Sequence, residues 1–82
     1  MMVVSVNLFG LQRKLTRKDQ IQISFQEEMR VTDVASYIRE RYPELGLDEE
    51  GLVVTVNNQI STPDRILKAN DKISFIPHIG GG

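Results

Sequence analysis

The chain has 82 residues, of which 40% are apolar and 26% charged, a composition typical of one small globular domain. It contains no cysteine, which excludes disulfides, thiolate metal sites and a cysteine nucleophile. Ten Lys and Arg residues against eleven Asp and Glu leave a net charge of −1, without the basic excess typical of nucleic-acid binding. Because no apolar run is long enough to cross a membrane and no signal peptide is recognisable, we expect a cytoplasmic protein that binds neither nucleic acid nor a membrane.

The N-terminal part contains two segments in which apolar and polar side chains alternate. Met2 to Phe9 alternates with the period of a half-buried strand, and Gly10 ends the pattern. The alternation resumes from Gln20 to Gln26. Residues 11–19 between them are polar and basic, so we expect a long loop that joins the two strands as an antiparallel hairpin.

A change of period after the hairpin predicts one helix. Thr32 is a favourable N-cap, and apolar residues then follow at helical spacing as far as Tyr42. Pro43 disfavours a helical conformation of the residue before it, so the predicted helix ends at about Tyr42. Tyr37 and Arg41 lie four residues apart and are expected to pack on each other.

The C-terminal part predicts three more strands. Leu52 to Val56 is a short β-branched run, which Asn57-Asn58 closes with a turn. Residues 59–60 allow a very short strand. The last strand, Ile73 to Ile76, ends at Pro77.

The order of these elements is strand, strand, helix, strand, short strand, strand. One helix can cover only one face of such a sheet, so the fold class is α+β with two layers. A hairpin followed by a crossover helix indicates the β-grasp (ubiquitin-like) arrangement: a mixed sheet of four or five strands whose first and last strands are adjacent and parallel. We assign residues 1–77 to this domain and residues 78–82 to a flexible C-terminal tail that ends in Gly-Gly.

Strand parity divides the apolar side chains between the two faces of the sheet. The set that faces the helix is Val4, Val6, Ile23, Phe25, Val54 and Phe75. The set on the other face, near the point where the tail leaves, is Val3, Phe9, Val53 and Ile76. Four apolar side chains on one face can form a patch that needs covering, so we predict a partner surface there.

The usual catalytic constellations are missing from the sequence. His78 is the only histidine, and there is no glycine-rich phosphate loop and no metal-ligand spacing, so we expect neither a metal site nor a bound cofactor. The carboxylates at 27–28 and 48–50 and the basic side chains within 13–18 are expected to be solvated. An enzyme that acts alone is not predicted.

The terminal triplet Gly80-Gly81-Gly82 is the exception to this lack of chemistry. Ordering glycine carries the largest entropic cost, so the triplet cannot help the fold. Without Cβ atoms it can thread a narrow channel, and the five residues after Pro77 reach at most about 16–18 Å. The carboxylate at its end is a poor electrophile until it is activated, for instance as a mixed anhydride with AMP. Nothing in the sequence binds ATP, so another protein must carry out that step.

Several segments, taken in order, make the chain resemble the small sulfur carriers of the MoaD/ThiS family, above all the small subunit of molybdopterin synthase. These segments are Val6-Asn7-Leu8-Phe9-Gly10 with Arg13, Arg41-Tyr42-Pro43-Glu44-Leu45, Val56-Asn57 with Gln59, and Leu67 to Ile73 followed by Phe75-Ile76-Pro77. The resemblance covers essentially the whole chain and ends on the glycine tail.

This resemblance implies a mechanism. An E1-like adenylyltransferase uses ATP to adenylate the Gly82 carboxylate, and a sulfur donor, a desulfurase or rhodanese, converts it to a thiocarboxylate. The tail then enters the large catalytic subunit of molybdopterin synthase, which adds two sulfurs to precursor Z as a dithiolene. Gly82 is the reactive residue, and Gly80 and Gly81 thread the channel. The partner interface is expected to comprise Phe9, Val53, Ile76, Pro77, His78 and Ile79.

The sequence departs from the family pattern in ways that leave the pathway open. Asn70 and His78 stand where glycine and proline are common, and Gly80 stands where Ala or Ser is common in molybdopterin synthase subunits. A third glycine also suits the carriers that deliver sulfur to thiazole synthase in thiamin synthesis. Two other functions start from the same fold: a ubiquitin-like modifier that is joined to lysines through Gly82, and a passive interaction module.

Overall fold

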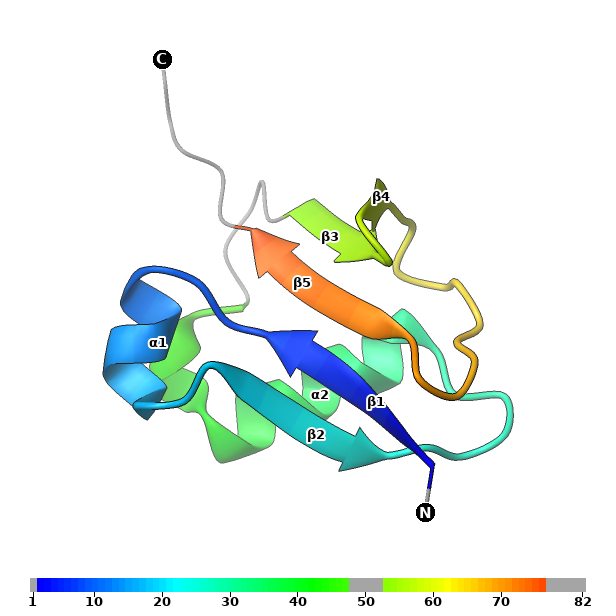
Figure 1. The fold of residues 1–82 in the computed structure, drawn as a ribbon, viewed down its shortest axis with the longest axis horizontal. Helices are drawn as coiled ribbons and strands as arrows, with labels where there is room; N and C mark the ends of the chain where they lie inside the picture. Colours follow the sequence, from blue (N-terminus) through cyan, green and yellow to red (C-terminus); the bar gives the residue numbers. More distant parts are fainter. Residues whose placement is uncertain (1, 48–52, 77–82) are drawn as a thin grey trace.

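The computed structural model describes residues 2–47 and 53–76 and shows the predicted β-grasp fold, a five-stranded mixed sheet with one long helix across one face (Figure 1). The strands are β1 (Val3–Asn7), β2 (Gln20–Ser24), β3 (Val53–Val56), β4 (Gln59–Ile60) and β5 (Lys72–Ile76). The helices are α1 (Leu11–Thr16), α2 (Val31–Arg41) and a 3₁₀ turn, η1 (Pro43–Leu45). No helix in the described part of the chain is long and apolar enough to cross a membrane.

The sheet has the strand order β2-β1-β5-β3-β4, so the first and last strands lie side by side at its centre. β1 pairs with β2 antiparallel and with β5 parallel, in the register Val6 opposite Ile73. β3 pairs antiparallel with both β5 and β4. The adjacent, parallel first and last strands are those that the element order predicted.

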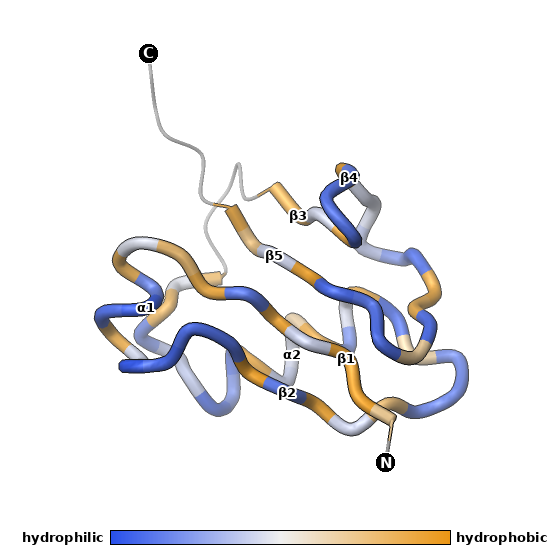
Figure 2. The backbone as a smooth tube through the Cα atoms, viewed as in Figure 1, coloured by the Kyte–Doolittle hydropathy of each residue, from blue (hydrophilic) through white to orange (hydrophobic). Residues whose placement is uncertain are grey.

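The core lies between the sheet and α2, on the face that parity predicted. Hydropathy alternates along β2 in Figure 2, and the inward side chains of β1, β2 and β5 are buried. Of the six side chains expected to face the helix, Val4, Val6, Ile23 and Phe75 are buried. Phe25 and Val54 are partly buried and pack against the same cluster.

Residues 11–19 are not the simple loop that their polarity suggested, because α1 forms within them. Gly10 starts α1 with φ 52° and ψ −122°, a conformation that a residue with a Cβ atom rarely adopts. Arg17 ends α1 in the left-handed region, and the Thr16 hydroxyl donates to the Gln12 carbonyl at 2.8 Å. A helix of six residues is too short to be stable alone, so its existence depends on tertiary contacts that local sequence does not reveal.

The helix α2 begins one residue before the predicted N-cap and ends one residue before Tyr42. Thr32 is not the cap, because the Asp33 carboxylate accepts a hydrogen bond from the Arg30 N–H at 2.8 Å and so fixes the start at Arg30. The predicted pairing on its surface is confirmed, with the Arg41 guanidinium 4.8 Å from the centre of the Tyr37 ring.

The turn predicted at Asn57-Asn58 is present, while two strands are shorter than predicted. Asn57, Asn58 and Asn70 all have positive φ, at 52°, 68° and 72°. β1 ends at Asn7, not at Phe9, and β2 ends at Ser24, not at Gln26. Leu52, predicted to begin the third strand, and Pro77, predicted to end the last one, lie outside the described residues.

Candidate functional site: the end of β5

β5 ends at Ile76, six residues before the last glycine in the sequence, and the two sides of this strand end are supported differently. On one side, Ile76 pairs with Val53 of β3. On the other side, the register with β1 ends where Asn7 meets Ser74. The last two residues of β5 therefore have a paired strand on one side only, and something else must satisfy their polar groups on the other side.

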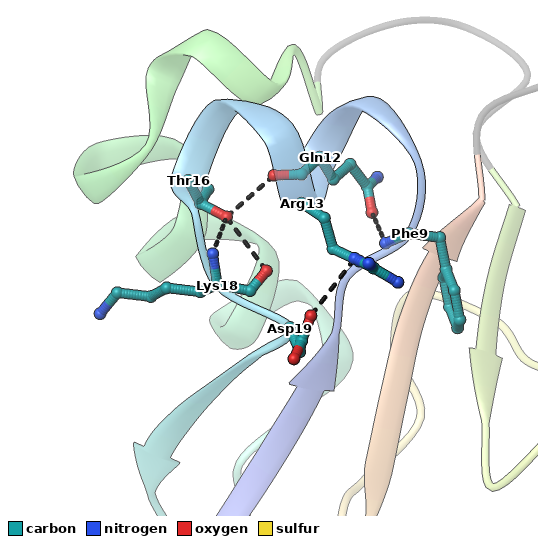
Figure 3. A network of polar contacts seen from close by, with 6 residues as sticks. All are labelled: Phe9, Gln12, Arg13, Thr16, Lys18 and Asp19. Atoms are coloured by element: carbon teal, nitrogen blue, oxygen red, sulfur yellow. Dashed lines mark hydrogen bonds and ion pairs between the residues drawn. The ribbon is translucent and has the colours of Figure 1, made fainter.

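The side chain of Gln12 lies in that place. Its Nε2 donates to the Phe75 carbonyl at 2.8 Å, and its Oε1 accepts from the Phe9 N–H at 3.3 Å (the latter is drawn in Figure 3). The side chain is buried, with 7% of the residue exposed. Sequence reasoning missed Gln12, because a glutamine in a basic segment looks solvated.

Three apolar side chains lie around the end of β5 on the face of the sheet away from the core. Phe9 and Ile76 are 54% and 41% exposed, and Val53, the register partner of Ile76, is partly exposed. We call Phe9, Val53 and Ile76 the end patch. The structure thus brings together the three described residues that the sequence assigned to a partner interface.

Val3 does not belong to the end patch, although parity places it on the same face. The Val3 carbonyl accepts from the Asn70 N–H at 2.7 Å, so Val3 lies beside the start of β5. Six residues of extended chain, about 20 Å, separate that position from Ile76. The expectation that Val3 lies near the tail was wrong, because parity assigns a face and says nothing of position along the strand.

The basic side chains of residues 13–18 are exposed along α1, as expected. They line an open depression of about 730 Å³, whose lining residues are Gly10, Leu11, Arg13, Lys14, Arg17, Lys18 and Asp19. Arg13 forms an ion pair with Asp19 at 3.2 Å, drawn in Figure 3, but both side chains are largely exposed. Such a pair contributes little to stability.

The acidic residues offer no catalytic pair among the described residues. Glu27 and Glu28 are exposed, as predicted, and line a second open depression of about 550 Å³ together with residues that include Tyr37 and Arg41. One carboxyl group, that of Asp64, has its pKa lowered, first by a hydrogen bond from the Thr62 side chain, then by its own backbone and by the charge of Arg30. In residues 2–47 and 53–76, no three His, Asp or Glu side chains are placed to hold a metal ion.

The remaining predicted site residues lie outside the described residues. They are the carboxylates at 48–50 and the C-terminal residues Pro77, His78, Ile79, Gly80, Gly81 and Gly82.

A family model described as the ThiS family matches residues 6–82, which is nearly the whole chain. The chain belongs to the ThiS family. This membership confirms the resemblance to MoaD/ThiS-type proteins, which are ubiquitin-like sulfur carriers, and the match includes the three C-terminal glycines. No curated protein matches the chain.

Solved structures of similar proteins show the same fold at low identity. The small archaeal modifier protein SAMP1 from Haloferax volcanii superposes with a TM-score of 0.82 at 15% identity, covering 98% of this chain and 99% of that one. SAMP1 from Methanosarcina acetivorans gives 0.78 at 23% identity, covering 100% and 98%. One chain of the complex of subunits 1 and 2 of the molybdopterin-converting factor from Helicobacter pylori gives 0.64 at 23% identity, covering 99% of this chain and 100% of that one.

Proposed function

We propose that this ThiS-family protein is a sulfur carrier that is loaded as a thiocarboxylate on Gly82 and supplies sulfur for molybdopterin synthesis. The observation that carries the proposal is the family match, which continues to residue 82 through the glycine triplet. Support for the molybdopterin destination comes from the four sequence segments that resemble the molybdopterin synthase small subunit. The Helicobacter pylori complex adds that a protein of this fold pairs with a second subunit of a molybdopterin-converting factor.

Loading begins with activation, because a carboxylate at neutral pH is a poor electrophile. An oxygen of the Gly82 carboxylate attacks the α-phosphorus of ATP in an E1-like enzyme, pyrophosphate leaves, and an acyl adenylate forms. A persulfide held by a desulfurase or rhodanese then attacks the carbonyl carbon, and AMP leaves. A thiol cleaves the resulting acyl disulfide, is itself oxidised to a disulfide, and releases the Gly82 thiocarboxylate. The carrier itself binds no cofactor, since ATP belongs to the activating enzyme.

Sulfur transfer takes place in the large catalytic subunit. The thiocarboxylate sulfur forms a bond to an electrophilic carbon of the pterin substrate, and the oxygen substituent of that carbon leaves. Water then hydrolyses the resulting thioester, which returns the Gly82 carboxylate and leaves the sulfur on the pterin as a thiol. Two loaded carriers supply the two sulfurs of the dithiolene. In this scheme the carrier is a co-substrate of the sulfurtransferase and not an enzyme on its own.

The end patch provides the docking surface in this proposal. Phe9, Val53 and Ile76 surround the last described residues before the tail, so a partner that covers them also receives the segment that follows. Apolar surface that a partner covers contributes roughly 25 cal/mol per Å². Pro77, His78 and Ile79 lie between this patch and the glycines in sequence, and we assign them to the same interface.

The glycines provide access rather than affinity. Gly80 and Gly81 carry no side chain, so a channel sized for bare backbone admits them and excludes other sequences. Holding the Gly82 carboxylate in line with its reaction partner can supply a large part of the rate, since misplacement by about 1 Å can cost on the order of a hundredfold.

A second candidate function is protein modification, which the fold shared with two SAMP1 modifiers favours. There the same acyl adenylate, directly or after transfer to a thiol, is captured by a lysine amine and forms an amide. Delivery to thiazole synthase in thiamin synthesis is the other alternative, because the third glycine suits it. All three functions share the activation step and differ in what attacks next.

Intact mass spectrometry of the protein purified from its own cells tests the proposal. A species in which one oxygen is replaced by sulfur, mapped to the C-terminal peptide, supports the carrier. Lysine-linked adducts that end in Gly82, without any thiocarboxylate, would support the modifier instead. Incubating the loaded protein with the large subunits of molybdopterin synthase and with thiazole synthase then identifies the acceptor by turnover.

A further inference from the structure

The residue Gln12 occupies the position of a missing peptide group between β1 and β5. In the parallel pair, the Ser5 N–H donates to the Asp71 carbonyl at 3.0 Å, and the register continues to Asn7 opposite Ser74. Regular spacing would next bring the Phe9 N–H to the Phe75 carbonyl. Those two groups instead meet the two ends of one side-chain amide, Oε1 and Nε2 of Gln12.

The amide is held in this place by the backbone around it. The Gln12 N–H donates to the Phe9 carbonyl at 3.0 Å, so both polar groups of Phe9 are satisfied by one residue. The Gln12 carbonyl accepts from the Thr16 hydroxyl at 2.8 Å, as Figure 3 shows. Gly10 begins the turn that brings Gln12 back towards β5.

α1 buries a polar side chain and exposes apolar ones, the reverse of the usual pattern, which indicates that the amide group of Gln12 is what this position requires. α1 buries Gln12, whereas Leu11 and Leu15 are 67% and 43% exposed. An apolar residue at position 12 would bury more hydrophobic surface but leave the Phe75 carbonyl and the Phe9 N–H without these partners. Buried backbone polar groups are almost always hydrogen-bonded, and the Gln12 amide supplies the partners that these two groups would otherwise lack.

We propose that Gln12 is a positioning residue that sets the direction in which the reactive tail leaves the domain. The proposal rests on the proposed function, since it concerns the same Gly82 chemistry. The Phe75 side chain is anchored in the core and Ile76 is paired with Val53, so the Gln12 amide is the contact that holds the β1 side of the strand end. Without it, Phe75 and Ile76 can rotate about the β3 side, and the tail samples directions that miss the activating site.

The variant Gln12→Met tests this by keeping the length of the side chain and removing both hydrogen-bonding groups. Gln12→Asn is the second variant, which keeps the amide but is one methylene too short to reach both partners. The matched control is Gln20→Met, because the Gln20 Nε2 also donates to a β1 residue, Asn7, at 3.1 Å, but at an exposed position on the other edge.

The kinetic measurement is adenylation by the activating enzyme, followed as carrier-dependent ATP–pyrophosphate exchange. We expect Gln12→Met and Gln12→Asn to lower kcat by about tenfold or more. KM for the carrier should stay within about twofold of wild type, since all three apolar side chains of the end patch are still present and Val53 stays paired in the sheet. Gln20→Met should match wild type in both constants. An unchanged kcat, or a raised KM with unchanged kcat, would overturn the positioning role while leaving the carrier function intact.

A second readout needs no enzyme and separates this proposal from the proposed function. In wild type, NMR should detect scalar coupling through the hydrogen bond from Gln12 Nε2 to the Phe75 carbonyl carbon. In either variant, the ¹⁵N order parameter of Ile76 should fall while that of Val4 stays constant. If no activating enzyme accepts the wild type, the carrier function fails and this measurement alone decides. An unchanged order parameter, or a failure of both variants to fold, would reject the positioning role.

Discussion

The two ends of β5 are fastened in different ways, although a buried polar side chain is central to each. At the start of the strand, the Asp71 carboxylate accepts from the Asn57 side-chain amide at 2.9 Å and from the Lys68 N–H at 2.7 Å. The Asn57 Oδ1 accepts from the Lys72 N–H at 3.0 Å, and the Val3 carbonyl accepts from the Asn70 N–H. At the other end, the β1 side is held by the neutral amide of Gln12.

This difference suggests that the start of β5 contributes mainly to the stability of the domain, whereas the end of β5 sets the direction of the C-terminal segment. The start of β5 closes a turn through several bonds, two of them to a charged group, so it contributes to the free energy of folding. The end of β5 has fewer bonds and leads to the segment that carries the chemistry. A change at the start should therefore lower the stability of the whole domain, and a change beyond the end should lower reactivity at nearly constant stability.

The largest expected effect lies beyond the end of the strand. A residue appended after Gly82 moves the carboxylate by about 3.3–3.6 Å, and Gly82→Ala adds a methyl group beside the reacting carbon. We expect either change to reduce thiocarboxylate formation by roughly a hundredfold or more, with the thermal midpoint unchanged. Mass spectrometry after reconstitution with the activating enzyme, ATP and a sulfur donor measures it.

A matched control is a residue added before Met1, which should leave sulfur loading normal. Normal loading of a chain extended past Gly82 would contradict the carrier mechanism. Deletion of residues 80–82 sharpens the same comparison, because we expect it to abolish loading and leave the unfolding free energy nearly unchanged.

Phe75 is an exception to this comparison, because it lies near the end of β5 but its side chain is part of the core and should therefore affect stability. Phe75→Ala should lower the unfolding free energy by about 3–5 kcal/mol, because it opens a cavity among buried side chains. Urea denaturation measures the change. Ile60→Ala, at an exposed position of β4, is the control and should stay within about 0.5 kcal/mol of wild type. A nearly silent Phe75→Ala would contradict the observed core.

The start of β5 should respond in stability alone. Asp71→Ala leaves the Lys68 N–H and the Asn57 amide without their acceptor, and we expect a loss of about 1.5–3 kcal/mol. Asp19→Ala, which removes an exposed ion pair with Arg13, should cost less than about 1 kcal/mol. Thermal and urea unfolding measure both losses. Equal losses in the two variants would mean that the polar cluster at the start of β5 stabilises the fold no more than an exposed ion pair does.

A smaller effect is expected at Gly10, which begins α1 and so brings Gln12 to the end of β5. A Cβ atom built on Gly10 meets no atom within 4 Å, so the cost of Gly10→Ala is backbone strain alone, about 1–2 kcal/mol. Calorimetry of Gly10→Ala measures it, with Glu40→Gly at an exposed position of α2 as a helix-propensity control that should cost less than about 1 kcal/mol. A stabilised Gly10→Ala variant would show that residue 10 does not hold this conformation.

The smallest effect concerns Asp64, away from both ends of β5. Its pKa is lowered in the folded state, so its hydrogen bonds stabilise the fold above the unfolded pKa, and this stabilisation is lost as the pH falls through the folded pKa. In Asp64→Asn, the free energy of unfolding should fall slightly less steeply than in wild type as the pH is lowered. At neutral pH, the variant should differ from wild type only by the loss of the hydrogen bonds that the Asp64 carboxylate accepts. A wild-type profile and an Asp64→Asn profile that run parallel below pH 4 or so would contradict this.

Much of the fold could be predicted because its strands carry a strong period-two signal. Ile21 and Ile23 alternate with polar neighbours, and the order of elements then leaves few topologies. α1 could not be predicted, because six residues with exposed Leu11 and Leu15 carry no inward apolar stripe. Phe9, Val53 and Ile76 were found from parity, whereas Val3 was misplaced because parity has no information about distance along a strand.

The sequence by itself determined the sheet faces, the crossover helix, the turn at Asn57-Asn58 and the glycine triplet, because each depends on residues close in the chain. Only the tertiary structure decided the role of Gln12, whose amide bonds to Phe9 nearby and to Phe75, 63 positions further along the sequence. It also decided that Asp71 and Asn57 form one cluster at the start of β5. A side-chain amide or carboxylate bonds to whichever backbone group the fold places within about 3 Å, and local sequence does not specify that partner.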